Sequence, residues 1–310
     1  MTAPRAMMAL GALCAALLVS CSSAPRQPDT VITVKTEGDQ AATTGQSYYR
    51  QGRYDLALQF FSQALSQYTS VDDGDGIVKA YIGVGRCYTA LGQAGEAEGV
   101  FLQARDRARE EGAASLLFDA RVNLGELYLS QGNPEKARTT LQEESTGQEK
   151  GRTPAQNAQL YHDLGTAEKG LGNSAPALED FNRSLKINLG AKYYAEAAAD
   201  YYMISSVYSR DGRYDEALTY ASQALQYDKR VESSPGIAKD LYALGLISGK
   251  KGDTAAAYDW LQRSYNVFVT LGFREDMKRA LTALVSAADA LGRTAEAEAY
   301  RKALADLGSS

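Results

Sequence analysis

The sequence predicts an all-α protein, an α-solenoid of about seven helix-turn-helix repeats. Two columns of small residues support this prediction: an alanine recurs every 40 residues, and a glycine stands five residues before each alanine. The alanines are Ala57, Ala97, Ala137, Ala177, Ala217, Ala257 and Ala297, and the glycines are Gly52, Gly92, Gly132, Gly172, Gly212, Gly252 and Gly292. A fixed period of this length is typical of a solenoid, in which each unit buries its apolar face against its neighbours. Such an architecture favours binding over catalysis.

Each unit has the pattern of a helix, a tight glycine turn and a second helix. In the first unit Leu58, Phe61 and Leu65 share one stripe of an amphipathic helix. Gly52 suits the left-handed position that ends the first helix, where a Cβ atom would be costly. The alanine column marks the place where the two helices cross too closely for a larger side chain.

Two further columns follow the same period. The first helix carries a small-residue column, Gly45, Gly85, Gly125, Gly165, Ser205 and Gly245, followed by Val285. The second helix carries Phe61, Phe101, Leu141, Phe181, Ala221, Leu261 and Arg301. The last unit departs from both columns and has a Glu/Ala/Arg-rich second helix, so we expect it to be a solubilising cap. In the third unit, residues 143–151 look like a longer solvated loop.

These columns resemble the tetratricopeptide repeat (TPR). Leu124-Gly125-x-x-Tyr128 and Ala97-x-x-x-Phe101-x-x-Ala104 match its signature residue for residue, and the resemblance covers roughly residues 41–307. It implies a right-handed superhelix that binds a protein partner in a groove lined by the first helices. The common repeat has about 34 residues, so this is a long, 40-residue variant of it. The extra residues lengthen either the helices or the connection between units, as in residues 67–76.

The N-terminus is expected to be a targeting segment. Residues 1–20 combine one positive charge, Arg5, with an apolar run from Ala6 to Val19, which is typical of a secretory signal peptide. Leu18-Val19-Ser20-Cys21 resembles the bacterial lipobox, which implies lipidation of Cys21 with acyl chains such as palmitate and a stable membrane anchor. Ser22, in place of aspartate, favours the periplasmic face of the outer membrane. The alternative is an ordinary cleaved signal with a coincidental cysteine.

The remaining chain is expected to divide into an extended tether, 21–40, and the TPR solenoid, 41–310. Prolines and small polar residues favour the tether, in which residues 31–34 form a plain linker, a short strand or a docking segment. Asp75 is expected to be the N-cap of the next helix.

Composition argues against several kinds of chemistry. Loss of Arg5 with the signal leaves 32 basic against 38 acidic side chains, a formal charge of −6, which does not suit a nucleic-acid partner. His162 is the sole histidine, and no phosphate-binding glycine loop is present. A calcium-like loop that starts at Asp73 has Val84 where a glutamate is needed. We therefore expect no enzymatic activity, no cofactor and no metal.

A binding groove is the more promising site. The resemblance places its exposed positions on the first helices, near the small-residue column. These are Tyr49, Arg50, Ile82, Arg86, Asn123, Glu126, His162, Lys169, Tyr202, Arg210, Tyr242 and Leu246. Their mixed aromatic, apolar and charged character suits a protein or peptide segment. The family's Lys/Asn carboxylate clamp is not reproduced; Arg86 and Asn123 come nearest.

Tyrosine is concentrated around the fifth repeat, where eight of the 20 lie between Tyr193 and Tyr227. An exposed patch of them would mark an interaction site, and extra helix packing is the alternative. Two functions follow. The first is a scaffold that holds a partner of an envelope machine for secretion, pilus, barrel-assembly or cell-wall work. The second is a lipoprotein that binds a glycan such as peptidoglycan, with tyrosines stacked on sugar rings.

Overall fold

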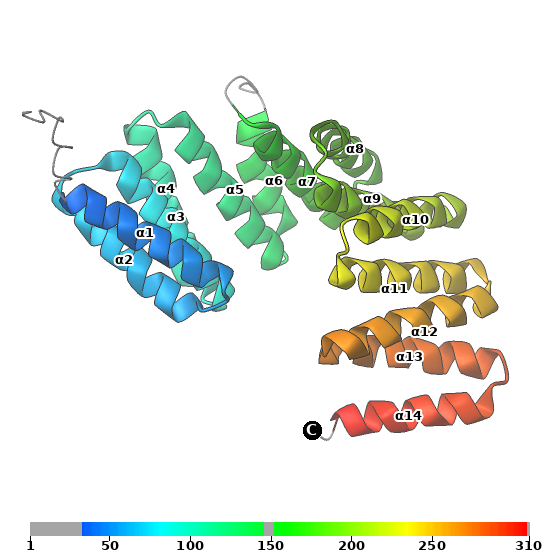
Figure 1. The fold of residues 1–310 in the computed structure, drawn as a ribbon. Helices are drawn as coiled ribbons and strands as arrows, with labels where there is room; N and C mark the ends of the chain where they lie inside the picture. The colour runs from blue at the N-terminus through cyan, green and yellow to red at the C-terminus, as the bar shows by residue number, and fades with distance from the viewer. Residues whose placement is uncertain (1–32, 146–151, 309–310) are drawn as a thin grey trace, which may run out of the picture. The chain divides into compact units, whose positions relative to one another are not determined.

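The computed structural model describes residues 33–145 and 152–308, and over these ranges the fold is all-α with no strand (Figure 1). The helices are α1 (Val34–Arg50), α2 (Tyr54–Ser70), α3 (Gly74–Ala90), α4 (Ala94–Glu110), α5 (Ala114–Ser130), α6 (Pro134–Ser145), α7 (Pro154–Gly170), α8 (Ser174–Ala191), α9 (Tyr194–Arg210), α10 (Tyr214–Arg230), α11 (Ser234–Lys251), α12 (Thr254–Leu271), α13 (Arg274–Ala290) and α14 (Thr294–Gly308). The predicted solenoid of helix-turn-helix repeats is confirmed. The predicted signal peptide, Cys21 and most of the tether lie outside the described residues.

Odd-numbered helices are the first helices of the repeats, and even-numbered helices are the second. Each helix packs on its neighbours in sequence, as Figure 1 shows. Within the described ranges the first helices also contact one another from repeat to repeat, as α7 does α9 and α9 does α11, whereas the second helices do not. The first helices therefore approach each other more closely, which is the arrangement that lets them line a groove.

The extra residues of the long repeat lengthen the helices. Most helices have 17 or 18 residues, against 12 in α6. The expectation of a longer connection in residues 67–76 is wrong, because α2 runs to Ser70 and α3 starts at Gly74. Asp75 is not an N-cap either: it lies in the first turn of α3, and Asp73 occupies the cap position.

The turns between repeats are built like the turns within them. A residue with positive φ follows most helices at intervals of 20 residues, from Gly52 (φ 73°) and Asp72 (φ 51°) to Gly292 (φ 69°). The next residue donates its backbone N–H to a carbonyl five residues back, as Arg53 does to Tyr48 at 3.0 Å. This bond belongs to the Schellman motif, which ends a helix with a left-handed residue. Asp72, Lys192 and Glu232 adopt that conformation without being glycine.

The small-residue column of the first helix receives the large side chain of the second. A Cβ atom on Gly85 would lie 2.5 Å from the Phe101 ring, and one on Gly125 would lie 2.6 Å from Leu141. In the fifth repeat Ser205 instead donates its hydroxyl to the carbonyl of Ala217 at 2.9 Å. The alanine column is buried throughout, as expected for a close helix crossing.

Both ends of the described array differ from the middle. Helix α1 starts at Val34, so the boundary expected at residue 41 falls inside a helix and residues 34–40 are not extended. Helix α14 buries only Ala297, and its role as a cap stays a prediction. Over the described ranges, no helix combines the length and the apolar character needed to cross a membrane.

Candidate functional site

All twelve predicted groove residues lie on first helices, from α1 to α11. At the N-terminal end of the groove, the Arg86 guanidinium stacks 4.6 Å from the centre of the Tyr49 ring. Asn123 does not combine with Arg86 into a clamp, because its amide donates to the Asp119 carbonyl of its own helix at 2.7 Å. Arg50 is exposed at the end of α1, and Ile82 is half-buried against a core cluster that includes Ala120 of α5.

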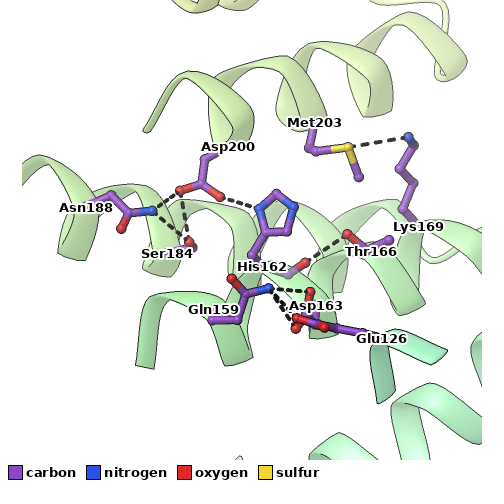
Figure 2. A network of polar contacts seen from close by, with 10 residues as sticks. All are labelled: Glu126, Gln159, His162, Asp163, Thr166, Lys169, Ser184, Asn188, Asp200 and Met203. Atoms are coloured by element: carbon purple, nitrogen blue, oxygen red, sulfur yellow. Dashed lines mark hydrogen bonds and ion pairs between the residues drawn. The ribbon is translucent and has the colours of Figure 1, made fainter. Parts of the chain in front are cut away.

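His162 lies at the centre of a polar network that joins α7, α8 and α9 (Figure 2). Its Nδ1 atom lies 2.7 Å from the Oδ1 atom of Asp200, which is fully buried. The other Asp200 oxygen accepts hydrogen bonds from Ser184 at 2.9 Å and from Asn188 at 2.8 Å. Burial lowers the pKa of His162, but the hydrogen bond and the charge of Asp200 raise it, and the net shift is upward. The network therefore favours a protonated imidazole.

A pair of acids lies beside this network. The Gln159 amide donates to Glu126 at 3.2 Å and to both Asp163 oxygens at 3.0 Å (Figure 2). Burial first, and then the charge of Glu126, raises the pKa of Asp163 to about 7, although Gln159 and His162 oppose the shift. Burial also raises the pKa of Glu126, although Arg86 and His162 oppose the shift. One of these carboxyl groups therefore titrates near neutral pH.

A cavity of about 490 Å³ lies between α9 and α11 and collects four of the predicted residues. Its lining is Tyr202, Ser205, Ser206, Ser209, Arg210, Tyr214, Tyr242, Ala243, Leu246, Ile247 and Lys250. We call it the tyrosine pocket. Leu246 is 39% exposed, whereas Tyr202 and Tyr242 are half-buried. The pocket joins an apolar and aromatic wall to two cationic groups.

Lys169 lies next to the tyrosine pocket. Its ammonium group has the Met203 sulfur, 3.9 Å away, as its hydrogen-bond acceptor. Burial and the positive charge of Arg210 lower its pKa. Arg210 donates to the Lys169 carbonyl and, at 3.0 Å, to the Ser174 hydroxyl. These two cations make this edge of the groove positive, in contrast to the acids around Asp163.

A second pair of buried acids, Asp228 and Asp240, lies between α10 and α11. The two carboxyl groups are hydrogen-bonded to each other, and one Asp240 oxygen is buried without a partner. Burial first, and then the charge of Asp228, raises the pKa of Asp240 to about 8. The sequence contained a signal for Asp200 and Asp240, because they are the two acids in a 40-residue column whose other members are Gln40, Ala80, Ala120, Leu160 and Ala280.

The surplus tyrosines of the fifth repeat mostly contact one another. Five rings form a continuous row on α9 and α10: Tyr194, Tyr227, Tyr201, Tyr220 and Tyr208, with centroids 5.3–6.2 Å apart from one ring to the next. Arg230 and Arg213 stack on the two ends at 3.9 and 4.5 Å. All five rings are half-buried. Helix packing therefore accounts for this row, and only Tyr202 and Tyr214 of the eight line the tyrosine pocket.

Two further points from the sequence concern the thiol of Cys87 and metal binding. Cys87 is buried, which raises the pKa of its thiol to about 11. Over residues 33–145 and 152–308, no group of three or more His, Cys, Asp or Glu side chains is placed to hold a metal ion.

The fold defines a helical repeat protein, and comparisons with known proteins identify the repeat. Three family models described as tetratricopeptide repeat match residues 39–110 and 195–268, residues 119–143, and residues 158–190. Together they cover more than half of the chain, which therefore belongs to the tetratricopeptide repeat proteins. No curated protein matches the sequence.

Solved structures with a similar fold share little sequence with this chain. Aspartyl phosphate phosphatase F from Bacillus subtilis is 16% identical, with a TM-score of 0.66 over 89% of this chain and 71% of its own. The apo quorum sensor NprR from B. thuringiensis is 16% identical, with a TM-score of 0.70 over 89% and 77%. A signal transduction ATPase with a TPR sensor from Pyrococcus horikoshii is also 16% identical, with a TM-score of 0.72 over 90% of this chain and 42% of its own. At this identity the likenesses show the fold alone.

Proposed function

We propose that this protein is a non-enzymatic scaffold that holds a segment of a protein partner in the groove of its first helices. The tyrosine pocket is the observation that supports this most strongly. Four residues predicted from the repeat pattern, on two successive first helices, line one cavity of about 490 Å³. Tyrosine and arginine are the side chains that most often dominate protein interfaces.

The chemistry of the pocket favours an extended peptide over a small metabolite. Tyr202, Tyr242 and Leu246 offer an apolar wall for one side chain of the partner, and Arg210 and Lys250 offer charge for an acidic neighbour. Beyond the pocket, the first helices α7 and α5 carry further polar side chains, Gln159 and Glu126, which are hydrogen-bonded to each other. A segment of several residues can therefore contact more than one repeat.

We further propose that the scaffold works in the bacterial envelope, anchored through lipidated Cys21 on the periplasmic face of the outer membrane. The lipobox-like Leu18-Val19-Ser20-Cys21 supports this, and its ligand would be a segment of an envelope complex of the secretion, pilus, barrel-assembly or cell-wall type. The negative net charge of the chain agrees with a partner other than nucleic acid.

The first test is crosslinking and affinity capture from the native envelope with the wild type and a Tyr202→Ala/Tyr242→Ala double variant. We expect a defined protein that the wild type captures and the double variant loses, at least about tenfold, because each truncated anchor costs more than about 1 kcal/mol. Val231→Ala and Val269→Ala remove exposed apolar side chains outside the pocket and serve as controls. A partner that the double variant retains would place the binding site elsewhere.

Capture of cell-wall material alone would instead support the alternative function, a glycan-binding lipoprotein. The observation that favours it is that Tyr202 and Tyr242 line the same cavity, where rings can stack on a sugar. The row of five tyrosines on α9 and α10 does not add to this case, because those rings stack on one another and on arginines.

A further inference from the structure

A second cavity, of about 270 Å³, lies between α7, α8 and α9. Its polar lining consists of Gln159, His162, Ser184, Asn188, Tyr193 and Glu196. None of these residues lines the tyrosine pocket. Its volume lies below the range of roughly 300–1,000 Å³ that small-molecule sites occupy. The space suits the end of one side chain of a larger ligand.

The side-chain oxygen of Asn188 has no partner there. Asn188 is only 3% exposed, and its amide nitrogen donates to Asp200 at 2.8 Å and to Ser184 at 3.3 Å. These bonds fix the orientation of the amide, because a carboxylate can only accept. The Oδ1 atom is left buried without a hydrogen bond, and it points away from Asp200 in Figure 2. A buried acceptor of this kind costs free energy until a donor reaches it.

Other groups around the cavity are also acceptors. Gln159 turns its nitrogen toward Glu126 and Asp163, which leaves its oxygen for a different partner. The Glu196 carboxylate forms no ion pair with any part of the chain that the structure describes. Asp200 accepts a hydrogen bond from Asn188 at 2.8 Å and adds negative potential, which a protonated His162 on its other oxygen opposes. The cavity therefore favours a positively charged ligand with several hydrogen-bond donors.

We propose that this cavity receives the guanidinium group of an arginine side chain, carried by the protein segment that the groove holds. The proposal rests on the proposed function because that segment supplies the arginine. A guanidinium presents five N–H donors in a planar fork, so it can serve Asn188, Gln159 and Glu196 together. Tyr193 is 37% exposed beside them and offers a ring face. At the next residue, the Arg230 guanidinium stacks on the Tyr194 ring at 3.9 Å.

The test uses His162 as a reporter, because a chain with a single histidine gives one set of imidazole signals. The purified protein, without a histidine tag, is titrated with N-acetyl-arginine amide and, as the matched uncharged probe, with N-acetyl-citrulline amide, while the imidazole shifts are followed by NMR. We expect a saturable shift with the arginine probe and binding at least about tenfold weaker with citrulline, as loss of a charge-assisted contact implies. No saturable shift, or equal affinity for the two probes, overturns the proposal.

Variants separate this site from the rest of the surface. Glu196→Gln removes an exposed charge without disturbing the core and should weaken arginine binding about fivefold. Glu179→Gln removes an exposed charge on α8 that does not line the cavity and should leave binding unchanged. An equal loss of arginine affinity in both variants would contradict the proposed site. Because the probe needs no partner protein, failure of the envelope capture experiment leaves this result standing, and failure of arginine binding leaves the scaffold function standing.

Discussion

Buried acids are the most unusual residues of this array. Asp200 is compensated by three hydrogen-bond partners on two helices, which is how a buried carboxylate is normally tolerated. Asp240 has only Asp228, itself an acid, and keeps one oxygen without a partner. Two acids in contact cannot both ionise without a large penalty, so this pair holds a proton at neutral pH.

The acid pair makes stability depend on pH. The pKa of Asp240 is raised to about 8 in the folded protein, against about 3.9 in an unfolded chain. The folded state thus binds more protons between these values, and stability falls as pH rises from about 4 to about 8. Asp240→Asn mimics the protonated acid at every pH. We expect it to melt at a higher temperature than the wild type at pH 8, with the difference shrinking toward pH 4.

Thermal melts by circular dichroism at several pH values check this, with the exposed Asp259→Asn as a control that should change little. A variant less stable than the wild type at pH 8 would show that Asp240 is ionised and usefully paired.

The repeat register predicted which residues lie on the first helices, but it could not predict how they pair. His162, Tyr202 and Tyr242 were placed correctly on first helices because they follow a 40-residue period. Asn188 was missed because it lies in the last turns of a second helix, outside the columns that define the repeat. Its unpaired oxygen follows from the amide orientation that Asp200 imposes, and no spacing in the sequence encodes an orientation.

Helix pairs hold together through a glycine on one helix and a large side chain on the other. Gly85 faces Phe101, which is only 1% exposed and cannot move away. Gly99 on α4 has nothing within 4 Å of the place where a Cβ atom would lie. Comparing substitutions at these two glycines therefore separates the effect of packing on stability from the effect of helix propensity.

We expect opposite effects when these glycines are changed to alanine. Gly85→Ala should destabilise the protein by on the order of 1 kcal/mol or more, because overpacking costs about 1–3 kcal/mol and the propensity gain offsets only part of it. Gly99→Ala should stabilise it by about 0.5–1 kcal/mol. Urea unfolding of both variants measures the difference, and equal stabilisation by the two would contradict the close packing of α3 on α4.

Turns within repeats were predictable, and several turns between repeats were not. A glycine marks each described turn within a repeat, so the sequence displays it directly. Asp72, Lys192 and Glu232 take the same left-handed conformation between repeats without the residue type that signals it. The backbone strain at these three residues is modest, and the packing of the flanking helices outweighs their preference for a right-handed conformation.

At the scale of the whole molecule, attachment to the membrane would come from Cys21. The described helices supply no membrane-crossing segment, and stable anchoring needs two or more acyl chains. We expect Cys21→Ser to move the protein from the carbonate-washed membrane fraction to the soluble fraction, while its melting temperature stays the same.

The measurement is fractionation followed by immunoblotting, with mass spectrometry of the N-terminus to detect the lipid. Ser23→Ala, two residues away, is the matched control and should remain in the membrane fraction. A Cys21→Ser variant that stays membrane-bound would mean that another contact retains it.

Even spacing of the turns also has a mechanical consequence. Helices in the described ranges touch only their near neighbours along the chain, so tension applied at the two ends meets a series of similar joints rather than one shared core. Each 40-residue unit that opens would release roughly 130–140 Å of chain. Such a molecule extends in steps of equal length as its units unfold, and the units can refold one at a time. It would therefore act as an extensible link between its two points of attachment.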